Sequence, residues 1–537
     1  MSNSMLAVKK QAAPWGEWFF LTLLIVGYYA WFSANTLLSA SENSRLLEVF
    51  DGDEYNNFNV VHQALTEHTL YIKWEVYGHF YYNLALLPFY VLQHFIPVSD
   101  SMLIVYQRLQ STLFAAGTVL LTFGLARRYS GRASAWMGSL LLMVAPYSFN
   151  YWSVTSHPDT LQMFLLVGGM FACCEYASSG KNKWLTVASV CAGLAFATKY
   201  AGIFLLPVIW LLCLGVFDKP GKLTFDFLRP QRVKSLLRPV FMTTIVFLLA
   251  FVIASPYSLA SWQFFKGMTI QSSFTSAGDI FRVSGNGFEW FAILGSPSLL
   301  GIVNGILLVV ALSSFLVKTW TTRGGEAFSY KGLLWAWALL FLAYAFFRVN
   351  LRHDRYMLVI LPVLYILLGM FVAETLDFIW ERFRQKTAYF FVAAAIAVVC
   401  ATDIAGGFAR QAELIEARQS REINNPAIQA GEWLEANYSP SARILYDKYS
   451  YIPPVFTRVW GTYNMSASLI ENFRPRIIVI NPAIRDIFRD ASLADSYVRG
   501  PEKFMESHDF YNAMEEQRLG YVLAADFNGI KIYVKER

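Results

Sequence analysis

Two neighbouring carboxylates in the N-terminal part of the chain could act on a proton. They stand in the sequence Asp51-Gly52-Asp53-Glu54-Tyr55, and the residues that follow are amphipathic at helical spacing. Asp51 and Glu54 are three residues apart, as in a capping box, so these acids could simply begin a helix. One carboxylate held at a membrane face could instead accept a proton from an acceptor hydroxyl or amine. The spacing alone leaves both interpretations open.

A second polar group stands just before an apolar run. It reads Ser156-His157-Pro158-Asp159. An aspartate at this place could cap the helix that follows, and a single histidine says little about chemistry. The functional alternative is that Asp159 faces the same aqueous compartment as the first two carboxylates.

Three arginines within nine residues form the third group. They are Arg348, Arg352 and Arg355, with His353 and Tyr356 in the same segment. A solvated loop would explain the cluster, but guanidinium groups also bind phosphate through two parallel hydrogen bonds. The sequence therefore predicts a phosphate-binding cluster here.

Lys199 stands alone in a two-residue turn between two apolar runs. Its ammonium could join the arginines at a phosphate, or it could snorkel to the membrane surface. Carboxylates and a phosphate clamp that face one compartment suit the transfer of a group from a lipid phosphate carrier. Such a site needs a base for the acceptor and cations for the phosphate charge, because phosphate is already a good leaving group.

The composition places most of the chain in a lipid bilayer. Of its 537 residues, 55% are hydrophobic, 17% aromatic and 15% charged, whereas soluble domains carry about 25% charged residues. A soluble two- or three-domain protein is therefore excluded, as are disordered and collagen-like chains. The 5 cysteines fall in apolar segments without metal-ligand spacing, and the 7 histidines are scattered, so we expect no metal or other cofactor.

Eleven apolar runs predict membrane-spanning helices. They lie at about 15–38, 102–126, 133–150, 159–178, 184–198, 200–217, 239–257, 296–317, 332–347, 357–376 and 388–406. One further run, 77–96, is rich in Tyr and Phe, which suit the membrane surface as well as its core.

The distribution of Lys and Arg decides where the run 77–96 lies. If it stays on the surface, the loops assigned to the cytoplasm carry 19 Lys and Arg, and the opposite loops carry 8. The positive-inside rule then places the N-terminus in the cytoplasm and residues 407–537 outside. If the run crossed, every later loop would invert and the bias would be backwards. We therefore expect residues 1–406 to form a polytopic α-helical membrane domain with a first outer loop at 39–101.

Residues 407–537 have the composition of a soluble domain. Their 16 basic and 17 acidic residues nearly cancel, so the charge gives no indication of nucleic-acid binding. The predicted elements are helices near 426–437 and 465–472, strands at 443–447 and 476–481, and a hairpin of strands 521–526 and 530–534 joined at Asn528-Gly529. We expect a C-terminal soluble α/β domain.

A series of short motifs runs in order through the membrane half. They are Asp53-Glu54, Arg108-Leu109, Arg127-Arg128-Tyr129, Ala145-Pro146, Pro158-Asp159, the segment 193–200, Arg355-Tyr356 and Leu361-Pro362. Together they resemble the GT-C membrane glycosyltransferases, in particular the family 39-like group of protein O-mannosyltransferases and lipid A aminoarabinose transferases. Relatives often carry Lys-Pro-Pro before the surface segment, whereas this chain has Lys73 and no prolines there.

The resemblance implies a GT-C fold and the transfer of a sugar from a polyprenyl-phosphate donor, with inversion, on the extracytoplasmic side. It implies that Asp53 is the catalytic base or positions the acceptor, with Glu54 and Asp159 in the same site. The residues it places at the donor phosphate are Lys199, Arg348, Arg352, Arg355 and Tyr356. Those expected to line the donor or acceptor cavity are Tyr55, Lys73, His79, His157 and His353.

The expected partners are a polyprenyl-phosphate sugar, a lipid, glycan or protein acceptor, and membrane lipid, without nucleic acid. The C-terminal domain could also bind a protein. We expect a bacterial inner membrane protein with a cytoplasmic N-terminus and a periplasmic C-terminal domain. Two other classes stay open, a transporter or flippase of lipid-linked substrates and a non-catalytic membrane scaffold. A transporter usually has paired repeats and charges at mid-membrane, whereas the polar residues here gather at the ends of apolar runs.

Overall fold

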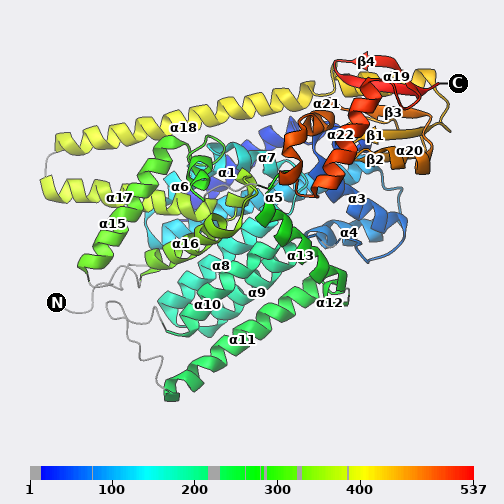
Figure 1. The fold of residues 1–537 in the computed structure, drawn as a ribbon. Helices are drawn as coiled ribbons and strands as arrows, with labels where there is room; N and C mark the ends of the chain where they lie inside the picture. The colour runs from blue at the N-terminus through cyan, green and yellow to red at the C-terminus, as the bar shows by residue number, and fades with distance from the viewer. Residues whose placement is uncertain are drawn as a thin grey trace.

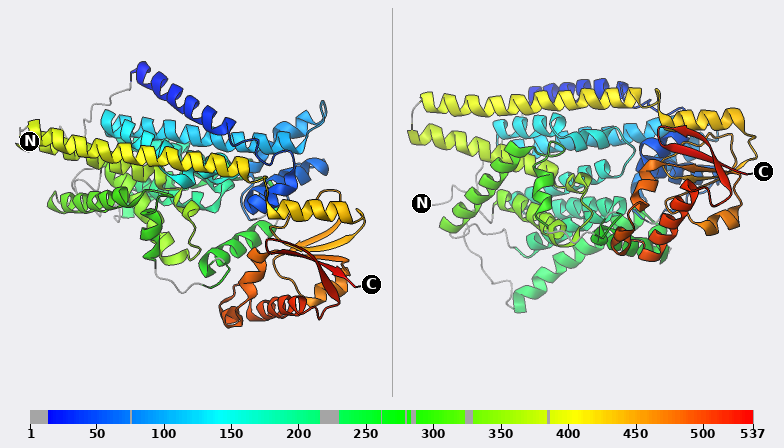
Figure 2. Two further views of the ribbon diagram at one scale, coloured as in Figure 1. Left: turned by 90° about the horizontal axis from the view of Figure 1, so that it is seen from above. Right: turned by 45° about the horizontal axis from the view of Figure 1, so that its top comes forward.

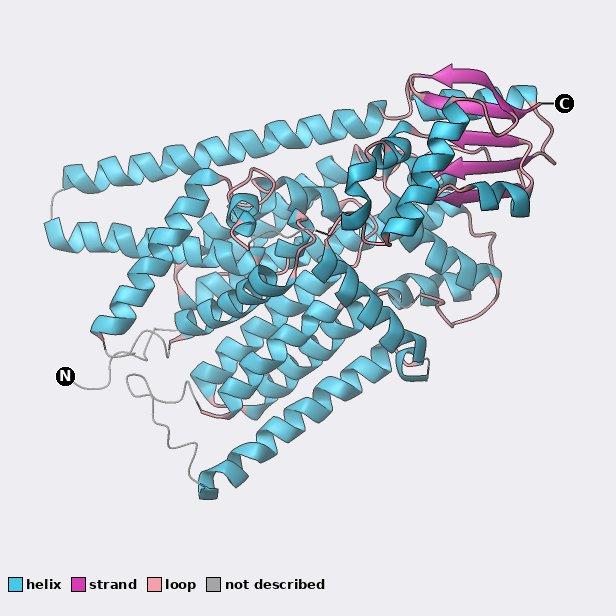
Figure 3. Cartoon of the chain, in the orientation of Figure 1, coloured by secondary structure: helices cyan, strands magenta, loops and turns pink. Residues whose placement is uncertain are grey.

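The computed structural model describes residues 14–74, 76–215, 230–260, 262–278, 280–282, 287–322, 329–383 and 386–536. Lys9 and Lys10 of the charge count, the end of the predicted span at 216–217 and residues 218–229 of the next loop lie outside this part of the chain. The described chain is mostly helical, with a small sheet near the C-terminus (Figure 3). Figures 1 and 2 show the sheet at one end of a long helical bundle.

Eight helices of the described residues are long and apolar enough to cross a membrane. They are α1 (Trp15–Ala34), α5 (Asp100–Tyr129), α8 (Asp159–Ser179), α11 (Pro230–Ala254), α15 (Ile302–Thr321), α16 (Tyr330–Arg348), α17 (Leu361–Phe383) and α18 (Lys386–Ser420). About 20 predominantly apolar residues cross the hydrocarbon core of a bilayer. The prediction of a polytopic helical membrane protein is therefore confirmed.

The other three predicted spans fall on shorter helices. These are α6 (Arg132–Val144), α9 (Asn182–Thr198) and the pair η1 (Tyr200–Phe204) and α10 (Leu205–Cys213). The predicted run 133–150 divides because Pro146 cannot continue a helix, and α7 (Tyr147–Ser153) begins directly after it. Of the eleven predicted spans, eight thus fall on helices of the described chain that reach this length and composition, and three fall on shorter helices.

The predicted first outer loop contains three helices, α2 (Ser44–Phe50), α3 (Gly52–Thr66) and α4 (Phe80–Leu92). With 13 residues, α4 is about 20 Å long, which is shorter than the roughly 30 Å hydrocarbon core. Figure 1 shows α3 and α4 at the same end of the molecule as the sheet. Further short helices are α12 (Tyr257–Ala260), α13 (Trp262–Ala277), α14 (Glu289–Leu294) and η3 (Asp354–Met357).

The C-terminal part is an α/β domain with a five-stranded sheet in the order β2-β1-β3-β5-β4. The strands are β1 (Arg443–Asp447), β2 (Arg458–Thr462), β3 (Ile477–Ile480), β4 (Tyr521–Phe527) and β5 (Ile530–Lys535). Strand β1 pairs in parallel with β2 and β3, whereas β5 pairs antiparallel with β3 and β4. The helices are α19 (Pro426–Asn437), α20 (Ala467–Phe473), α21 (Pro482–Arg485) and α22 (Pro501–Glu515), with the short turns η4 (Asp486–Phe488) and η5 (Ala491–Ser496).

Polar contacts attach this domain to the membrane half. Helix α18 continues past the predicted boundary at residue 406 and ends at Ser420. Just before its end, an Arg418 nitrogen donates to the carbonyl of Val154 at 3.0 Å. From α2, the buried Glu48 forms an ion pair with Lys448, which follows β1. These contacts place the loops after the parallel strands over the outer helices.

Candidate functional site

The first turn of α3 carries the two predicted carboxylates. The Asp51 side chain caps this helix, because it accepts hydrogen bonds from the backbone N–H of Asp53 at 3.1 Å and of Glu54 at 3.0 Å. Asp53 forms an ion pair with Arg355, which lies in η3 and 302 residues further along the chain. The fold therefore brings the predicted base and one predicted phosphate ligand into direct contact.

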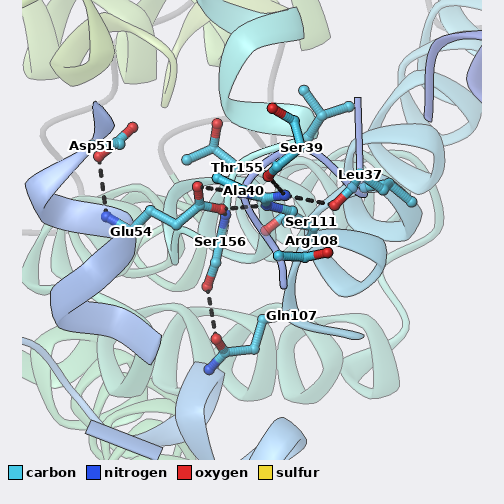
Figure 4. A network of polar contacts seen from close by, with 12 residues as sticks. Leu37, Ser39, Ala40, Asp51, Glu54, Gln107, Arg108, Ser111, Thr155 and Ser156 are labelled. Atoms are coloured by element: carbon cyan, nitrogen blue, oxygen red, sulfur yellow. Dashed lines mark hydrogen bonds and ion pairs between the residues drawn. The ribbon is translucent and has the colours of Figure 1, made fainter. Parts of the chain in front are cut away.

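Glu54 lies in a different environment, although it is the next residue (Figure 4). Its side chain is fully buried, and its two oxygens each accept a hydrogen bond from Arg108 at 2.8 Å. One oxygen also accepts the backbone N–H of Ser156 at 2.9 Å. Burial alone would raise the pKa of Glu54, but the Arg108 charge and the hydrogen bonds that Glu54 accepts together outweigh burial and lower the pKa to about 2.

These bonds correct two expectations about Glu54. The capping box is only half formed, because Asp51 caps the helix while the Glu54 side chain bonds to Arg108 instead of returning to the cap. Both Glu54 oxygens are also occupied, so neither is free to take a proton from an acceptor. Glu54 holds the α3 turn against α5 and the Ser156 backbone, and Asp53 is the carboxylate left to face a ligand.

Asp53 is held in its charged form. Partial burial would raise its pKa, but the surrounding cations, Arg355 first among them, together with the Arg355 hydrogen bond outweigh burial and hold the pKa below the usual range of an aspartate. An ionised carboxylate at neutral pH can accept a proton, although a low pKa makes it a weak base. Its strength as a base therefore depends on what else occupies the Arg355 guanidinium.

Asp159 and Lys199 form a second, buried ion pair. The Lys199 ammonium lies 2.6 Å from one Asp159 oxygen, and His157 Nδ1 lies 3.1 Å from the other. The Lys199 backbone carbonyl accepts a hydrogen bond from the Gln162 amide at 2.6 Å. Lys199 is 7% exposed, so it does not snorkel to the surface, and the predicted phosphate-binding alternative fits its position better.

A close backbone contact places the outer loop against Lys199. A Cβ added to Gly78 would lie 2.0 Å from the carbonyl oxygen of Ala197, so only glycine allows this approach. The ring of the neighbouring Tyr77 lies 5.1 Å from the Lys199 ammonium. The ring of Tyr356, from a later segment of the chain, lies 5.3 Å from the same ammonium. Two aromatic rings thus flank the lysine, as the cation–π geometry favours.

Three cavities meet around these pairs. The outer cavity, of about 830 Å³, is lined from the membrane half by residues that include Asp51, Asp53, Trp152, His353 and Arg355, and from the C-terminal domain by residues that include Tyr449, Tyr463, Phe488, Tyr497 and Arg499. The apolar cavity, of about 260 Å³, is lined mainly by side chains such as Ile203, Phe204, Met268, Phe341 and Val359. Its polar lining residues include Asp159, Lys199 and Arg355.

The third cavity lies between the other two. This middle cavity has a volume of about 180 Å³ and shares Asp53 with the outer cavity and Tyr77 and Tyr356 with the apolar cavity. Arg355 lines all three. His157 lines the middle cavity as well. The predicted residues Asp53, Asp159, Lys199, Arg355, Tyr356, His157 and His353 therefore line one connected set of cavities.

Two of the three clustered arginines lie elsewhere. Arg352 forms an ion pair with Glu289 at 3.1 Å, and its guanidinium lies 5.3 Å from the Trp290 ring. Arg348 is the last residue of α16 and is exposed. Neither lines the three cavities, whereas Arg355, Lys199 and Tyr356, the other predicted phosphate ligands, do.

Three further predicted cavity residues are also placed outside these cavities. Lys73 is half exposed and pairs with Glu67 at 2.6 Å on the surface. His79 is buried, and its Nε2 lies 2.8 Å from the Trp74 carbonyl oxygen. Tyr55 lines a separate cavity of about 460 Å³. Sequence position near the acids was not enough to place these side chains, because a helix turns successive residues to different faces.

Sequence reasoning did not assign a role to several residues that shape the site. Arg108 was noted only as part of a motif, yet it holds Glu54 and donates to the backbone carbonyls of Leu37 at 2.5 Å and Ser39 at 2.7 Å. A buried arginine in an apolar run was the available signal, since such a charge needs a partner.

In the described part of the chain, no group of three or more His, Cys, Asp or Glu side chains could hold a metal ion.

Residues 84–226 match the family model described as dolichyl-phosphate-mannose-protein mannosyltransferase. No protein of curated function matches the whole sequence closely enough to be a relative.

Solved structures share the fold over nearly the full chain. ArnT from Cupriavidus metallidurans bound to undecaprenyl phosphate has a TM-score of 0.55 and 13% identity, over 97% of this chain and 98% of that one. The oligosaccharyltransferase AglB from Archaeoglobus fulgidus, in complex with an inhibitory peptide and a dolichol-phosphate, has a TM-score of 0.52 and 11% identity, over 98% of this chain and 75% of that one. The family match and this shared fold confirm the predicted resemblance to the GT-C membrane glycosyltransferases.

Proposed function

We propose that the protein transfers a sugar from a polyprenyl-phosphate carrier to a lipid, glycan or protein acceptor, with inversion at the sugar carbon. The observation that carries this proposal is the contact between Asp53 and Arg355 at the junction of three cavities. A base, a phosphate ligand, an apolar cavity and a polar cavity meet there, as this reaction requires.

The apolar cavity and the two cations that line it suit the donor. The polyprenyl chain would enter the apolar cavity, and its phosphate would lie near Lys199 and Arg355, the cations among the lining residues. Guanidinium and ammonium groups stabilise the charge that develops on the departing phosphate. The solved relatives named above bind undecaprenyl phosphate and a dolichol-phosphate, which supports a donor of this class.

Asp53 would act on the acceptor from the outer cavity. As the acceptor oxygen forms a bond to the sugar carbon, its proton passes to an Asp53 oxygen. The bond from that carbon to the phosphate oxygen breaks, and its electron pair leaves with the phosphate. Attack from the face opposite the phosphate inverts the carbon.

Arg355 would couple donor binding to the strength of this base. In the unliganded site, its charge holds the pKa of Asp53 low. When a donor phosphate shares the guanidinium, Asp53 loses part of that stabilisation, its pKa rises and it becomes a better proton acceptor. The base is then strongest when a donor is present.

From the arrangement of the cavities and the charges of the loops, we also assign the acceptor site and the orientation of the protein in the membrane. The outer cavity is lined by both halves of the protein, so we assign it to the acceptor and give the C-terminal domain a part in holding it. With the charge bias of the loops, we place this cavity and the domain in the periplasm of a bacterial inner membrane and the N-terminus in the cytoplasm. The domain could also bind a protein partner.

The test is an Asp53→Asn variant of the purified full chain. Wild type should consume a polyprenyl-phosphate sugar in the presence of a membrane-lipid acceptor mixture, as measured by mass spectrometry. Asp53→Asn should fold and bind donor but lose transfer by at least 100-fold, because the amide cannot take the proton. Asp509→Asn, on the exposed face of α22, is the matched control and should transfer normally.

Two results would contradict the proposal. Retained transfer in Asp53→Asn would remove Asp53 from the mechanism. Movement of intact donor across vesicle membranes without cleavage would favour a flippase instead.

A further inference from the structure

His157 has a buried ring nitrogen without a partner. The residue is fully buried, with its ring centroid 4.6 Å from that of Trp152 and 6.2 Å from that of Tyr77. Its Nδ1 lies 3.1 Å from an Asp159 oxygen. Its Nε2 has no hydrogen-bond partner among the residues that the structure describes. Because an unpaired buried polar atom costs free energy, this nitrogen points to a missing ligand.

A second unpaired atom belongs to the same cavity. His157 and Trp74 both line the middle cavity, and Trp74 Nε1 is also buried without a partner in the described chain. Asn56 adds a polar amide to the lining. The cavity therefore presents one nitrogen able to accept a hydrogen bond and one N–H able only to donate.

The size of the middle cavity limits what it can hold. About 180 Å³ corresponds to the volume of about six water molecules. That is room for one small polar ring. Polar atoms that accept and donate in so small a space suit the hydroxyl groups of a monosaccharide.

The position of the middle cavity indicates which part of the substrates this ring belongs to. It shares Arg355, Tyr77 and Tyr356 with the apolar cavity and Asp53 with the outer cavity. In an in-line transfer, the moving group lies between the leaving phosphate and the attacking oxygen. The middle cavity is thus the space between the two assigned substrate sites.

We infer that the middle cavity binds the transferred group as a single sugar, and that His157 Nε2 and Trp74 Nε1 hydrogen-bond its hydroxyls. This inference rests on the proposed function and names the part of the donor that the site reads.

Asp159 makes both contacts to Nδ1 of His157. Its carboxylate oxygen lies 3.1 Å from Nδ1 and its backbone nitrogen 3.4 Å from it. The carboxylate is the closer and charged partner, so it favours a proton on Nδ1 and leaves Nε2 as an acceptor for a sugar hydroxyl. The flanking Trp152 and Tyr77 rings prevent the imidazole from turning away. Asp159 therefore positions both Lys199 for the phosphate and His157 for the sugar.

The experiment compares binding of a bare carrier with binding of a sugar-bearing carrier. The probes are a short-chain polyprenyl phosphate and the same carrier with one mannose, glucose, N-acetylglucosamine or pentose. In His157→Phe, the ring packing is kept but the Nε2 acceptor is lost. This variant should bind the preferred sugar-bearing carrier about five- to ten-fold more weakly and the bare carrier unchanged. The matched control is His94→Phe, the same change at an exposed histidine after α4.

Each outcome decides a separate question. If wild type binds neither form of the carrier, the proposed function fails. If it binds the bare carrier but gains nothing from any sugar, or if His157→Phe keeps the full gain, the sugar site is wrong while the donor class stands. If His157→Phe does not fold, Trp74→Phe carries the same test, because it removes the indole N–H and keeps an aromatic ring at a half-buried position. Unchanged sugar-dependent binding in that variant would also overturn the inference.

Discussion

A single guanidinium organises the charges of the unliganded site. Arg355 pairs with Asp53, lines all three cavities and lies 5.6 Å from the Trp152 ring. Arg352, three residues earlier, instead pairs with Glu289. The two arginines thus have the same side chain, but only Arg355 lines the cavities. This difference makes them a matched pair for experiment.

Arg355→Gln should lower kcat/KM for the donor by about 100-fold, because it removes a cation from the developing phosphate charge. Arg352→Gln should change it by less than about five-fold, since the Glu289 ion pair and the Trp290 ring that Arg352 contacts lie outside the three cavities. Steady-state kinetics with varied donor measure both variants. Equal losses in the two would show that the guanidinium pair, and not Arg355 alone, serves the donor.

Glu54→Gln tests the reassignment of Glu54 from chemistry to structure. The variant leaves Arg108 buried without a charged partner, so we expect a loss of about 3–5 kcal/mol in the free energy of unfolding. Thermal unfolding of the full chain in detergent measures this loss. Asp53→Asn should unfold near the wild-type temperature, because its carboxylate is partly exposed. A Glu54→Gln protein that is fully stable but inactive would return Glu54 to the catalytic mechanism.

The residues of the candidate site could be predicted from the sequence, whereas most of the contacts between them could not. Asp53, Asp159, Lys199 and Arg355 were recognisable because charged side chains stood beside apolar runs without an architectural reason. Their pairing could not be predicted, because it joins residues up to 302 positions apart. The burial of Glu54 was equally hidden, since its capping-box spacing has a local explanation.

At the scale of elements, glycines set how closely the outer loop approaches the spans. Gly78 meets the Ala197 carbonyl at the end of α9, directly before Lys199. Gly193, in the same helix, lets α11 approach, since an added Cβ would lie 2.3 Å from the Phe247 carbonyl. Small residues at such contacts are typical of membrane helix packing.

Gly78→Ala should displace the outer loop, because the new Cβ would overlap a backbone atom that cannot rotate away. A shift of about 1 Å in a positioning residue can cost about 100-fold in rate, so we expect transfer to fall by at least ten-fold. The control is Gly27→Ala in α1, where an added Cβ meets nothing within 4 Å. Wild-type transfer in Gly78→Ala would mean that the loop need not contact α9.

Several of the C-terminal elements were predictable, whereas strand β2 and the helices α21 and α22 were not predicted. The two buried strands β1 and β3 and the hairpin of β4 and β5 have clear apolar patterns and an Asn-Gly turn. Strand β2 was missed because it is a half-exposed edge strand that contains Gly461. That glycine lies under the Tyr446 ring, where an added Cβ would be 2.5 Å from a ring atom. Strand β2 therefore depends on tertiary packing, which cannot be read from the local sequence.

At the scale of the whole molecule, the C-terminal domain completes the outer cavity. Buried within this domain, Asp447 accepts hydrogen bonds from the Tyr511 hydroxyl at 2.6 Å and the Asn481 N–H at 3.0 Å. The loop after β1 contributes Tyr449 to the cavity lining, and α21, which follows β3, contributes Ile484. The domain that contains Asp447 therefore forms one side of the outer cavity.

Asp447 should make the stability of this domain depend on pH. Burial raises the pKa of Asp447 to about 7, so the folded chain keeps a proton that the unfolded chain releases above about pH 4. Stability should therefore fall as pH rises from about 4 to 7, by at most about 1.4 kcal/mol per pH unit. Thermal unfolding of the full chain at several pH values measures the slope. Asp447→Asn should flatten it and the exposed control Asp509→Asn should not, whereas a wild type without any slope would contradict the buried-acid argument.

The most direct measurement is a structure of the full chain with a polyprenyl phosphate bound. The account predicts that the phosphate contacts Lys199 and Arg355, that the lipid chain fills the apolar cavity and that the pair between Arg355 and Asp53 loosens. Asp53 would then face the outer cavity as a free carboxylate. A phosphate bound away from Arg355, with the Asp53 pair unchanged, would contradict the claim that donor binding activates the base.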